Sequence, residues 1–307
     1  MERKISFGDV QVAVTEAYEA YKSIKEGTVD SRIDVKDPKA FGISIVLTDG
    51  TVVNKGDTDV LSALGDITKI PTHVILLSQN SPEELVKKAG VCRCHGRKAE
   101  KPRIPVSAHG VRAVSAIVPQ NDPDGKMDII VSNIESLMAS APVLDDKLYE
   151  TLKKEVADAN TIDTIAAADY TLYDQADIAL DIYTKLVALQ ATTEQAATLG
   201  ATIAADGRNP KNGQEVFDGK ISANVTALVA RGPHREGRAW MMEVGVPAKS
   251  SFGGLVLAIM PGFGAIAAYS PELDENGVSV KAAKAVKYIA NKLQLNVYAS
   301  ARVEVVK

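Results

Sequence analysis

Residues 244–279, VGVPAKSSFGGLVLAIMPGFGAIAAYSPELDENGVS, decide the fold of this chain. They hold two apolar runs of strand length, FGGLVLAIM and FGAIAAY, which meet at Pro261-Gly262. Proline followed by glycine marks a tight turn between extended segments. The stretch therefore predicts two strands joined by a short turn. We expect a further strand just before them, over residues 239–246.

The flanking segments extend this pattern toward both ends of the chain. After the stretch, residues 280–293 predict a helix, and residues 296–306 are β-rich. Near the start, apolar residues recur at helical spacing over residues 10–26, and Gly27 ends the run. Two β-branched runs within residues 41–56 are separated by Asp49-Gly50, a hairpin signal. Both ends of the sequence thus predict antiparallel strands with a flanking helix.

The middle of the chain has a different character. Residues 146–199 are rich in Ala and Leu at helical spacing, in stretches such as DDKLYETLKKEV and DIALDIYTKLVALQ. Strands at both ends with helices between them predict an α+β protein whose sheet domain is interrupted by a helical insertion. We place the discontinuous sheet domain at residues 1–70 plus 225–307, and the mainly helical domain at residues 71–224.

Composition limits the functions that the chain can have. It has 307 residues, 46% of them apolar, which suffices for a sizeable core. Lys and Arg number 35 against 39 Asp and Glu, and basic residues form no run, so we expect no nucleic-acid partner. The first residues, MERKISFGDV, have no apolar region behind them, and later apolar stretches are interrupted by Gly, Pro or charge. We expect a cytoplasmic protein without a membrane partner.

The two cysteines lie together in the segment VCRCHGRK. Cys92 and Cys94 are separated by one residue, which places them poorly for a mutual disulfide and agrees with a reducing compartment. With His95 they offer three soft ligands for zinc. A structural zinc site needs a fourth ligand, and the sequence has no second cysteine or histidine cluster of suitable spacing. We favour a surface loop with two free thiols and predict no metal site.

Four stretches, in chain order, resemble the serine-dependent glutaminases, a bacterial-type family with the fold of serine β-lactamases and penicillin-binding proteins. They are residues 33–60, the segment KPRIP at 101–105, residues 198–213, and residues 244–279, the last of which matches nearly residue for residue. The resemblance covers most of the chain. It implies a β-lactamase-like antiparallel sheet flanked by helices, with an inserted all-helical domain. It also implies a homo-oligomer and no cofactor.

The position of the family's nucleophile is changed. Glutamine hydrolysis needs a nucleophile and a base, which the family supplies from Ser-x-x-Lys at a helix start. Here that place reads Asp66-Ile67-Thr68-Lys69. Lys69 matches the base, but Asp66 offers no hydroxyl, and its carboxylate would stabilise the ammonium form of Lys69. An i,i+3 ion pair between them, of about 0.2–0.5 kcal/mol, is the simpler expectation.

Pro71 follows this motif closely. Proline disfavours a helical conformation at Ile70, so we expect the helix to begin only at Pro71. That start would displace Lys69 from the family geometry. Ser62 and Thr68 are the nearest other hydroxyls, but neither stands three residues before a lysine. We expect neither to replace the missing nucleophile.

The resemblance also assigns the substrate contacts, and several of them have changed. Ala108 stands where the family has an asparagine, with Ser107 and His109 beside it. The acidic partner of the substrate ammonium group falls on Lys153 or Leu152, so its charge is reversed or lost. Asn160 and Tyr183 match an asparagine and a tyrosine of the family. His234 falls on or next to the position of a second family tyrosine.

The segment PAKSSFGG completes the implied site. It resembles the family's Lys-Ser-Gly strand, the counterpart of Lys-Thr-Gly in β-lactamases. Lys249 and Ser250 match the pattern, and the backbone amide of Phe252 would serve as an oxyanion donor. Ser251 replaces the usual glycine, and Phe252 is bulkier than the usual valine. A phenylalanine here would fill space meant for glutamine.

Three hypotheses follow. The resemblance implies an L-glutamine amidohydrolase, which converts glutamine and water to glutamate and ammonia through an acyl-enzyme. The residues favour a glutaminase-like protein with impaired chemistry, or a non-catalytic protein that binds an amino acid such as glutamine or glutamate or acts as an interaction subunit. A third hypothesis is a new activity that uses Asp66, Lys69, His109 and His234.

Overall fold

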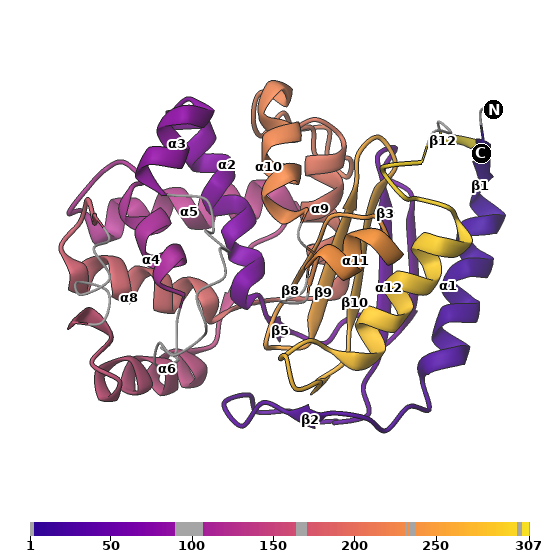
Figure 1. Ribbon diagram of the computed structural model, residues 1–307, viewed down its shortest axis with the longest axis horizontal. Coiled ribbons are helices and arrows are strands. Elements are labelled where there is room, and N and C mark those ends of the chain that lie inside the picture. The colour runs from indigo at the N-terminus through magenta and orange to yellow at the C-terminus, as the bar shows by residue number, and fades with distance from the viewer. Residues whose placement is uncertain are drawn as a thin grey trace.

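The protein consists of a sheet half and a helical half that lie side by side (Figure 1). The computed structural model describes residues 3–89, 107–163, 171–230, 232–233, 237–299 and 303–306. The two ends of the chain meet at one corner, where β1 (Arg3–Ser6) pairs in parallel with β12 (Val303–Val306). The sheet is thus assembled from segments far apart in sequence, as both ends of the sequence predict.

A five-stranded antiparallel sheet forms the centre of one half. The strands follow the order β4-β3-β10-β9-β8, and every neighbouring pair is antiparallel. The predicted α+β class with an antiparallel sheet is therefore confirmed. The strands are β3 (Gly42–Leu47), β4 (Val52–Gly56), β8 (Ala248–Ser250), β9 (Leu255–Met260) and β10 (Gly264–Tyr269).

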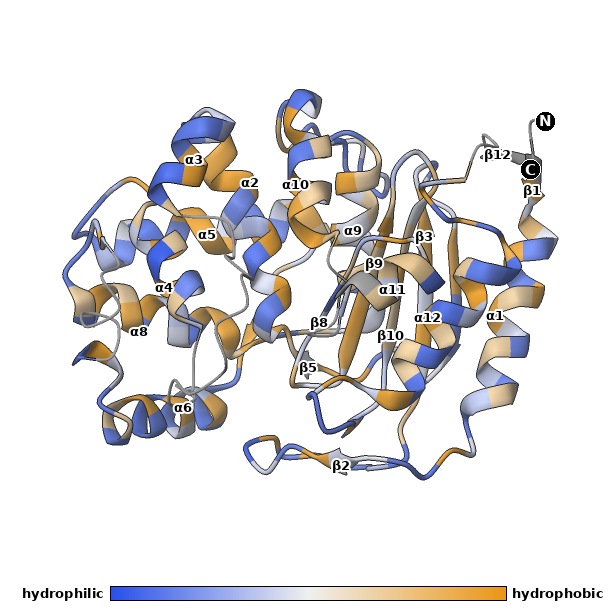
Figure 2. Ribbon diagram, in the orientation of Figure 1, coloured by the Kyte–Doolittle hydropathy of each residue, from blue (hydrophilic) through white to orange (hydrophobic). Residues whose placement is uncertain are grey.

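Helices cover both faces of this sheet. Side chains alternate along a strand, so Leu257 and Ile259 face one core cluster while Val256 and Ala258 face the other. Helix α9 (Thr193–Ala204) packs on the first face, and α1 (Phe7–Tyr21) and α12 (Val280–Lys292) cover the second. Burial on both sides explains why the three inner strands, β3, β9 and β10, are apolar at almost every position, as their orange colour in Figure 2 shows.

Gly200 lets α9 approach the sheet closely. A Cβ atom at this position would lie 2.6 Å from the Ala265 Cβ and 2.8 Å from a Leu257 methyl carbon. Helix α9 lies within the predicted helical insertion, yet it packs on the sheet, and one core cluster runs through both halves. The division at residues 70 and 225 stays a prediction.

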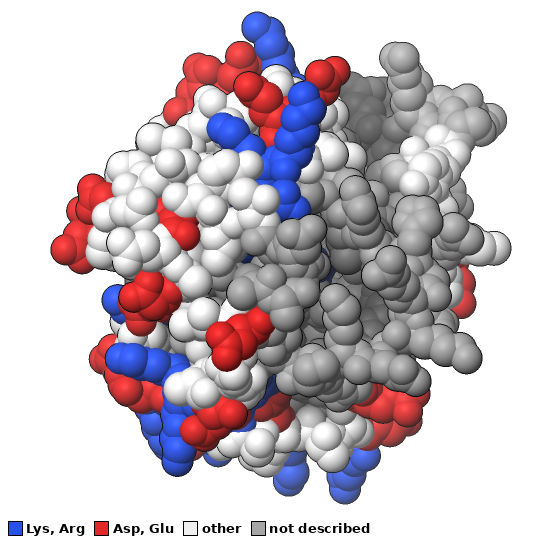
Figure 3. Space-filling model, turned by 60° about the vertical axis from the view of Figure 1, so that its left-hand side comes forward, with Lys and Arg blue, Asp and Glu red and all other residues white. Residues whose placement is uncertain are grey.

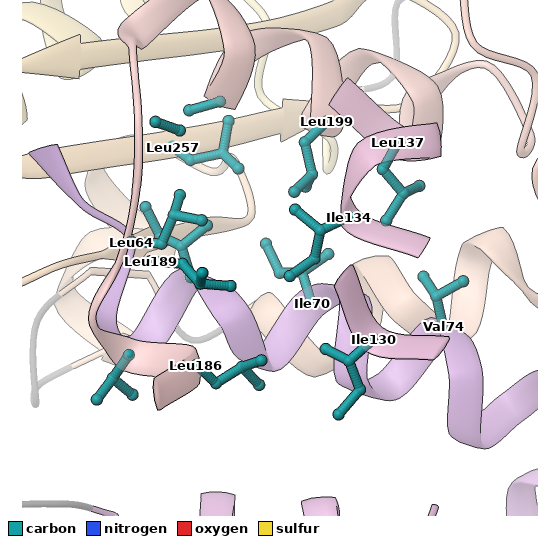
Figure 4. Close-up of a cluster of buried hydrophobic side chains, with 14 of the residues drawn as sticks. Leu64, Ile70, Val74, Ile130, Ile134, Leu137, Leu186, Leu189, Leu199 and Leu257 are labelled. Atoms are coloured by element: carbon teal, nitrogen blue, oxygen red, sulfur yellow. The ribbon is translucent and has the colours of Figure 1, made fainter. Parts of the chain in front are cut away.

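The helical half is built around α2 and α5. In Figure 4, Ile70 and Val74 of α2 lie near Ile130 and Ile134 of α5, with Leu199 of α9 close by. This core fixes the start of α2, from which the candidate site is built. The helices here are α2 (Lys69–Gln79), α3 (Pro82–Lys88), α4 (Ala108–Ser115), α5 (Pro123–Met138), α6 (Asp146–Asp158), α8 (Ala176–Val187) and α10 (Ser222–Val229).

Short elements complete the fold. A small sheet has the order β5-β7-β6, and β2 pairs with β11. Within the described ranges, no helix is long and apolar enough to span a membrane. The short elements are β2 (Thr28–Val29), β5 (Ser62–Ala63), β6 (Val143–Leu144), β7 (Leu189–Ala191), β11 (Glu272–Leu273), and the 3-10 turns η1 (Gly65–Thr68) and η2 (Gly219–Ile221).

Two expectations about local structure need correction. Residues 239–246 do not form a strand, because Gly237–Glu243 is helix α11. Trp240 is buried against the second core cluster, and its indole N–H donates to the Val246 carbonyl at 2.8 Å, which stabilises a helical turn. The first helix begins earlier than residue 10, because Ser6 and Asp9 form a capping box.

Candidate functional site

The site begins where η1 runs into α2. Thr68 and Lys69 both have helical backbone angles, so the chain turns without a break from one element to the next. The expectation that the helix starts at Pro71 is wrong, because α2 starts at Lys69. Pro71 lies in the first turn of α2, where a backbone N–H has no intrahelical acceptor and proline is tolerated. Lys69 therefore keeps its place three residues after Asp66.

Asp66 is held by three side chains from separate parts of the fold. Its Oδ2 lies 2.8 Å from the Lys69 Nζ and 3.7 Å from the Lys249 Nζ. The Tyr183 hydroxyl donates to Oδ1 at 3.4 Å. The predicted i,i+3 ion pair is present; β8 adds a second ammonium group and α8 adds a hydroxyl donor. We call Asp66, Lys69, Lys249 and Tyr183 the Asp66 cluster.

The cluster keeps Asp66 ionised. Solvent reaches 44% of the Asp66 side chain, although protein surrounds the rest of it. Desolvation raises the pKa of Asp66, but the charges of Lys69 and Lys249 and the hydrogen bonds from Lys69 and Tyr183 together hold that pKa below its usual value. Burial, with the neighbouring Asp66 charge, raises the pKa of Tyr183, so its hydroxyl stays a donor. Asp66 is therefore a carboxylate at neutral pH and a weak base.

Two neutral imidazoles lie beside Lys69. His73, one turn along α2, donates from Nδ1 to the Lys69 carbonyl, and its ring stacks on His109 with centroids 5.9 Å apart. Burial is the main cause that lowers the pKa of both histidines to about 4, and Lys69 and Lys249 lower it further. His109 thus stands near the cluster, as the third hypothesis requires, but as a neutral group. His73 was missed by sequence reasoning, although its spacing from Lys69 is helical.

Phe252 forms one wall of the site. Gly65 has φ +48°, and a Cβ atom there would lie 3.0 Å from the Phe252 Cδ1 and 2.7 Å from the Ser251 Oγ. The ring therefore packs against the backbone immediately before Asp66. The backbone N–H of Phe252 has no hydrogen-bond acceptor among the described residues. The oxyanion-donor role that the resemblance assigns to this amide stays a prediction.

The remaining predicted contacts are dispersed. Ala108 begins α4, and the Tyr183 ring packs against Gly110 in the same turn and hydrogen-bonds Ser107. Lys153 instead lies over the Tyr149 ring, with Nζ 5.3 Å from its centroid. The Asn160 side chain donates to the Asp163 carboxylate at 2.6 Å. His234 lies outside the described residues, as do Cys92, Cys94, His95 and the KPRIP segment.

The other hydroxyls close to the site are already bonded. Ser62 donates to the Gly253 carbonyl at 2.7 Å, and Thr68 donates to the Gly65 carbonyl at 2.6 Å. Ser251 donates to the Ala63 carbonyl. All three side chains are buried. In the described part of the chain, none of these hydroxyls is placed to give its proton to Lys69.

Arg32 is a further site residue that sequence reasoning missed. Its guanidinium carbon lies 4.5 Å from the centroid of the Phe252 ring, and its Nη1 lies 3.7 Å from an oxygen of Glu155. Arg32 follows β2 in the sheet half, and Glu155 belongs to α6 in the helical half. Arg32 therefore contacts both the helical half and Phe252, the wall of the site. No motif marks Arg32, because the contact depends on a loop of the sheet half reaching the helical half.

The described residues offer no metal centre. Among them, no group of three or more His, Cys, Asp or Glu side chains is arranged to hold a metal ion. Figure 3 turns the helical half forward, and Lys and Arg side chains alternate with Asp and Glu over the described part of that face.

Replacing Gly65 by alanine should lower the free energy of unfolding by about 2 kcal/mol. The left-handed backbone disfavours a Cβ atom, and the added carbon would also press on Ser251 and Phe252. Gly277→Ala is the matched control, because Gly277 has φ +78° with no atom within 4 Å of an added Cβ. Urea unfolding should show a smaller loss for the control, of about 1 kcal/mol. Equal losses of unfolding free energy in the two variants would mean that the contacts of the added carbon with Ser251 and Phe252 do not destabilise the protein.

Comparison with known proteins gives a consistent result. A family model described as Glutaminase matches residues 31–298. The glutaminase of Parabacteroides distasonis is 32% identical over 320 aligned positions, which cover 100% of both chains. The glutaminase of Bacteroides thetaiotaomicron is 33% identical over 312 positions, which cover 97% of each.

Solved structures agree with the sequence comparisons. A probable glutaminase, YbaS, superposes with a TM-score of 0.86 at 27% identity, over 96% of this chain and 100% of that one. A probable glutaminase from Bacillus subtilis, complexed with 6-diazo-5-oxo-L-norleucine, superposes with a TM-score of 0.77. It is 22% identical and covers 94% of this chain and 96% of that one, so its likeness concerns the fold alone.

Proposed function

Because this chain belongs to the glutaminase family, we propose that it retains a small-ligand site in the family's position but is impaired in glutamine hydrolysis. The ligand class that the family suggests is an amino acid such as glutamine or glutamate. The B. subtilis relative is bound to a norleucine derivative of that size. In this proposal the protein acts by binding, and turnover is slow or absent.

The observation that carries the proposal is the state of Asp66. A nucleophile for amide hydrolysis needs an unshared oxygen lone pair of high basicity, aimed at the substrate carbonyl. Asp66 instead shares one oxygen between two ammonium groups and the other with Tyr183. The pKa of Asp66 is lowered, so its carboxylate is less basic and a weaker nucleophile. Lys69, the candidate base, is bound to this carboxylate, and the serine and threonine hydroxyls described near it are bonded to backbone carbonyls.

The hydrogen bonds of neighbouring hydroxyls support the same conclusion. Ser62, Thr68 and Ser251 each donate to a backbone carbonyl and are buried. Freeing one of them would leave a buried carbonyl unpaired, at a cost of about 1–3 kcal/mol. A substitute nucleophile would also have to move into the site from its present position. The proposal follows from these bonds rather than from the sequence difference alone.

Ammonia release from glutamine tests the proposal. The unmodified protein should turn over at least about 10⁴-fold more slowly than a glutaminase with its serine, since losing a nucleophile in other hydrolases costs up to about 10⁶. Asp66→Ser should raise the rate above that of the unmodified protein, because Lys69 then has a hydroxyl to activate. The gain should be small, since Phe252 narrows the site.

Two controls make this assay specific. Asp66→Ala removes the same carboxylate without adding a hydroxyl, so it should not gain activity. Lys69→Ala in the Asp66→Ser background should abolish the gain. Rapid ammonia release by the unmodified protein, lost in Lys69→Ala, would show that the chain is an active glutaminase and that the proposal is wrong.

A further inference from the structure

We propose that Arg32 binds a carboxylate group of a small ligand at this site, with Phe252 as the aromatic shelf beside it. The inference rests on the proposed function only in taking the Asp66 cluster and its wall as a ligand site. It adds a recognition residue, Arg32, that lies outside the four segments that resemble the family. It also names the ligand class, a small carboxylate.

The guanidinium of Arg32 is rigidly presented. Its Nε donates to the Asp30 Oδ1 at 2.8 Å and its Nη2 donates to Oδ2 at 2.6 Å, while the Arg32 backbone N–H also bonds Oδ1 at 3.0 Å. Asp30 thereby fixes both the loop and the plane of the side chain. Because the fork is held in place before a ligand arrives, little side-chain entropy is lost on binding.

This arrangement leaves part of the guanidinium without hydrogen bonds. Arg32 has five N–H donors, and the side-on pairing with Asp30 uses the Nε edge. The Nη1 group faces Glu155 at 3.7 Å, which is an ion pair but too long for a hydrogen bond. The Arg32 side chain is 21% exposed, so this edge of the guanidinium is open to solvent and to a ligand. A carboxylate matches the geometry of these donors.

Phe252 connects this edge to the Asp66 cluster. The ring stacks with the Arg32 guanidinium and also packs against Gly65, the residue before Asp66. The backbone N–H of Phe252, for which the described residues provide no acceptor, adds a donor in the same segment. A ligand on this shelf therefore meets a guanidinium, an aromatic ring and a free amide, which together favour a carboxylate on a short carbon chain.

Glu155 lies on the Nη1 side of Arg32. Its side chain is 39% exposed and contacts Arg32 at 3.7 Å, so a ligand carboxylate can replace it at low cost. We therefore expect Glu155 and the ligand to compete for Arg32. Removing the charge of Glu155 should then strengthen binding, whereas a purely structural role for the Arg32–Glu155 contact predicts weaker binding.

Calorimetry with glutarate tests the proposal, because glutarate has two carboxylates and cannot be hydrolysed. Glutarate should bind in the millimolar range, and glutaramide, which has the same length without charge, should not. Arg32→Met should weaken glutarate binding tenfold or more. Lys147→Met is the matched control, because Lys147 pairs with Asp34 at 2.7 Å and also ties this loop to α6, away from Phe252. It should leave the affinity unchanged.

The Glu155→Gln variant tests whether Glu155 competes with the ligand carboxylate for Arg32. It should tighten glutarate binding about two- to fivefold while leaving the Arg32–Asp30 pair intact. Failure of the unmodified protein to bind glutarate at 20 mM would overturn the proposal. So would equal affinity in Arg32→Met, or weaker binding in Glu155→Gln. These outcomes are separate from ammonia release, which concerns catalysis and would overturn the proposed function alone.

Discussion

Replacing Lys126 by methionine should lower the free energy of unfolding by about 3–5 kcal/mol. Lys126 in α5 and Asp174 just before α8 form an ion pair whose two side chains are both 0% exposed. The Lys126 Nζ also donates to the Val114 and Ser115 carbonyls, each at 3.2 Å, at the end of α4. Methionine fills similar space but leaves the Asp174 carboxylate buried without its partner.

A double variant separates the buried charge from lost packing. Lys126→Met with Asp174→Asn removes both charges and keeps an acceptor for the Asn121 backbone N–H, which now bonds the Asp174 Oδ1 at 2.7 Å. The double variant should be about 2 kcal/mol more stable than Lys126→Met. Urea unfolding at pH 7 measures both effects. If the double variant were no more stable than the single one, the buried carboxylate would not be the cause.

A surface pair gives the matched control for this prediction. Lys211 pairs with Glu194, and their side chains are 36% and 30% exposed. Lys211→Met makes the same chemical change where solvent screens the charges. It should cost less than about 1 kcal/mol.

Acidification from pH 7 to pH 4.5 should remove about 2 kcal/mol of stability through His73 alone. Burial lowers the pKa of His73 from 6.5 to about 4 in the folded protein, with Lys69 and Lys249 adding to the effect. Between these two values the unfolded chain binds a proton that the folded protein does not. Stability is therefore complete above pH 6.5 and falls as the pH drops toward 4.

His109 should add a smaller loss in the same window. Burial, with the charges of His73, Lys69, Lys249 and Arg112, also lowers its pKa to about 4. Its side chain is only partly buried, so solvent screens its share. Below pH 4 the lowered pKa of Asp66 adds a further loss as that carboxylate becomes protonated.

Urea unfolding at pH 7.0 and 4.5 tests this prediction with His73→Asn. Asparagine keeps a donor for the Lys69 carbonyl but does not titrate in this range. The variant should lose about 2 kcal/mol less than the unmodified protein on acidification. An unchanged pH dependence in His73→Asn combined with His109→Gln would show that other groups cause the loss.

The sequence predicted the parts of the site that depend on local spacing. Asp66 and Lys69 stand three residues apart in one turn, so their ion pair follows from helix geometry. Pro71 misled the prediction of where α2 begins, because the effect of proline depends on its position within the first turn. Residues 239–246 were misassigned because an apolar run suits a strand or a helix, and the burial of Trp240 decides for the helix.

The stretch 244–279 determined the fold by itself, because two apolar runs around a tight turn can bury both faces only within a covered antiparallel sheet. Only the tertiary structure brought Lys249 and Tyr183 to Asp66 and placed Arg32 on Phe252. These contacts join β8, α8 and the loop after β2, and sequence separation contains no information about distances between packed elements. Local geometry thus fixed the ion pair at Asp66, and packing of the two halves decided what surrounds it.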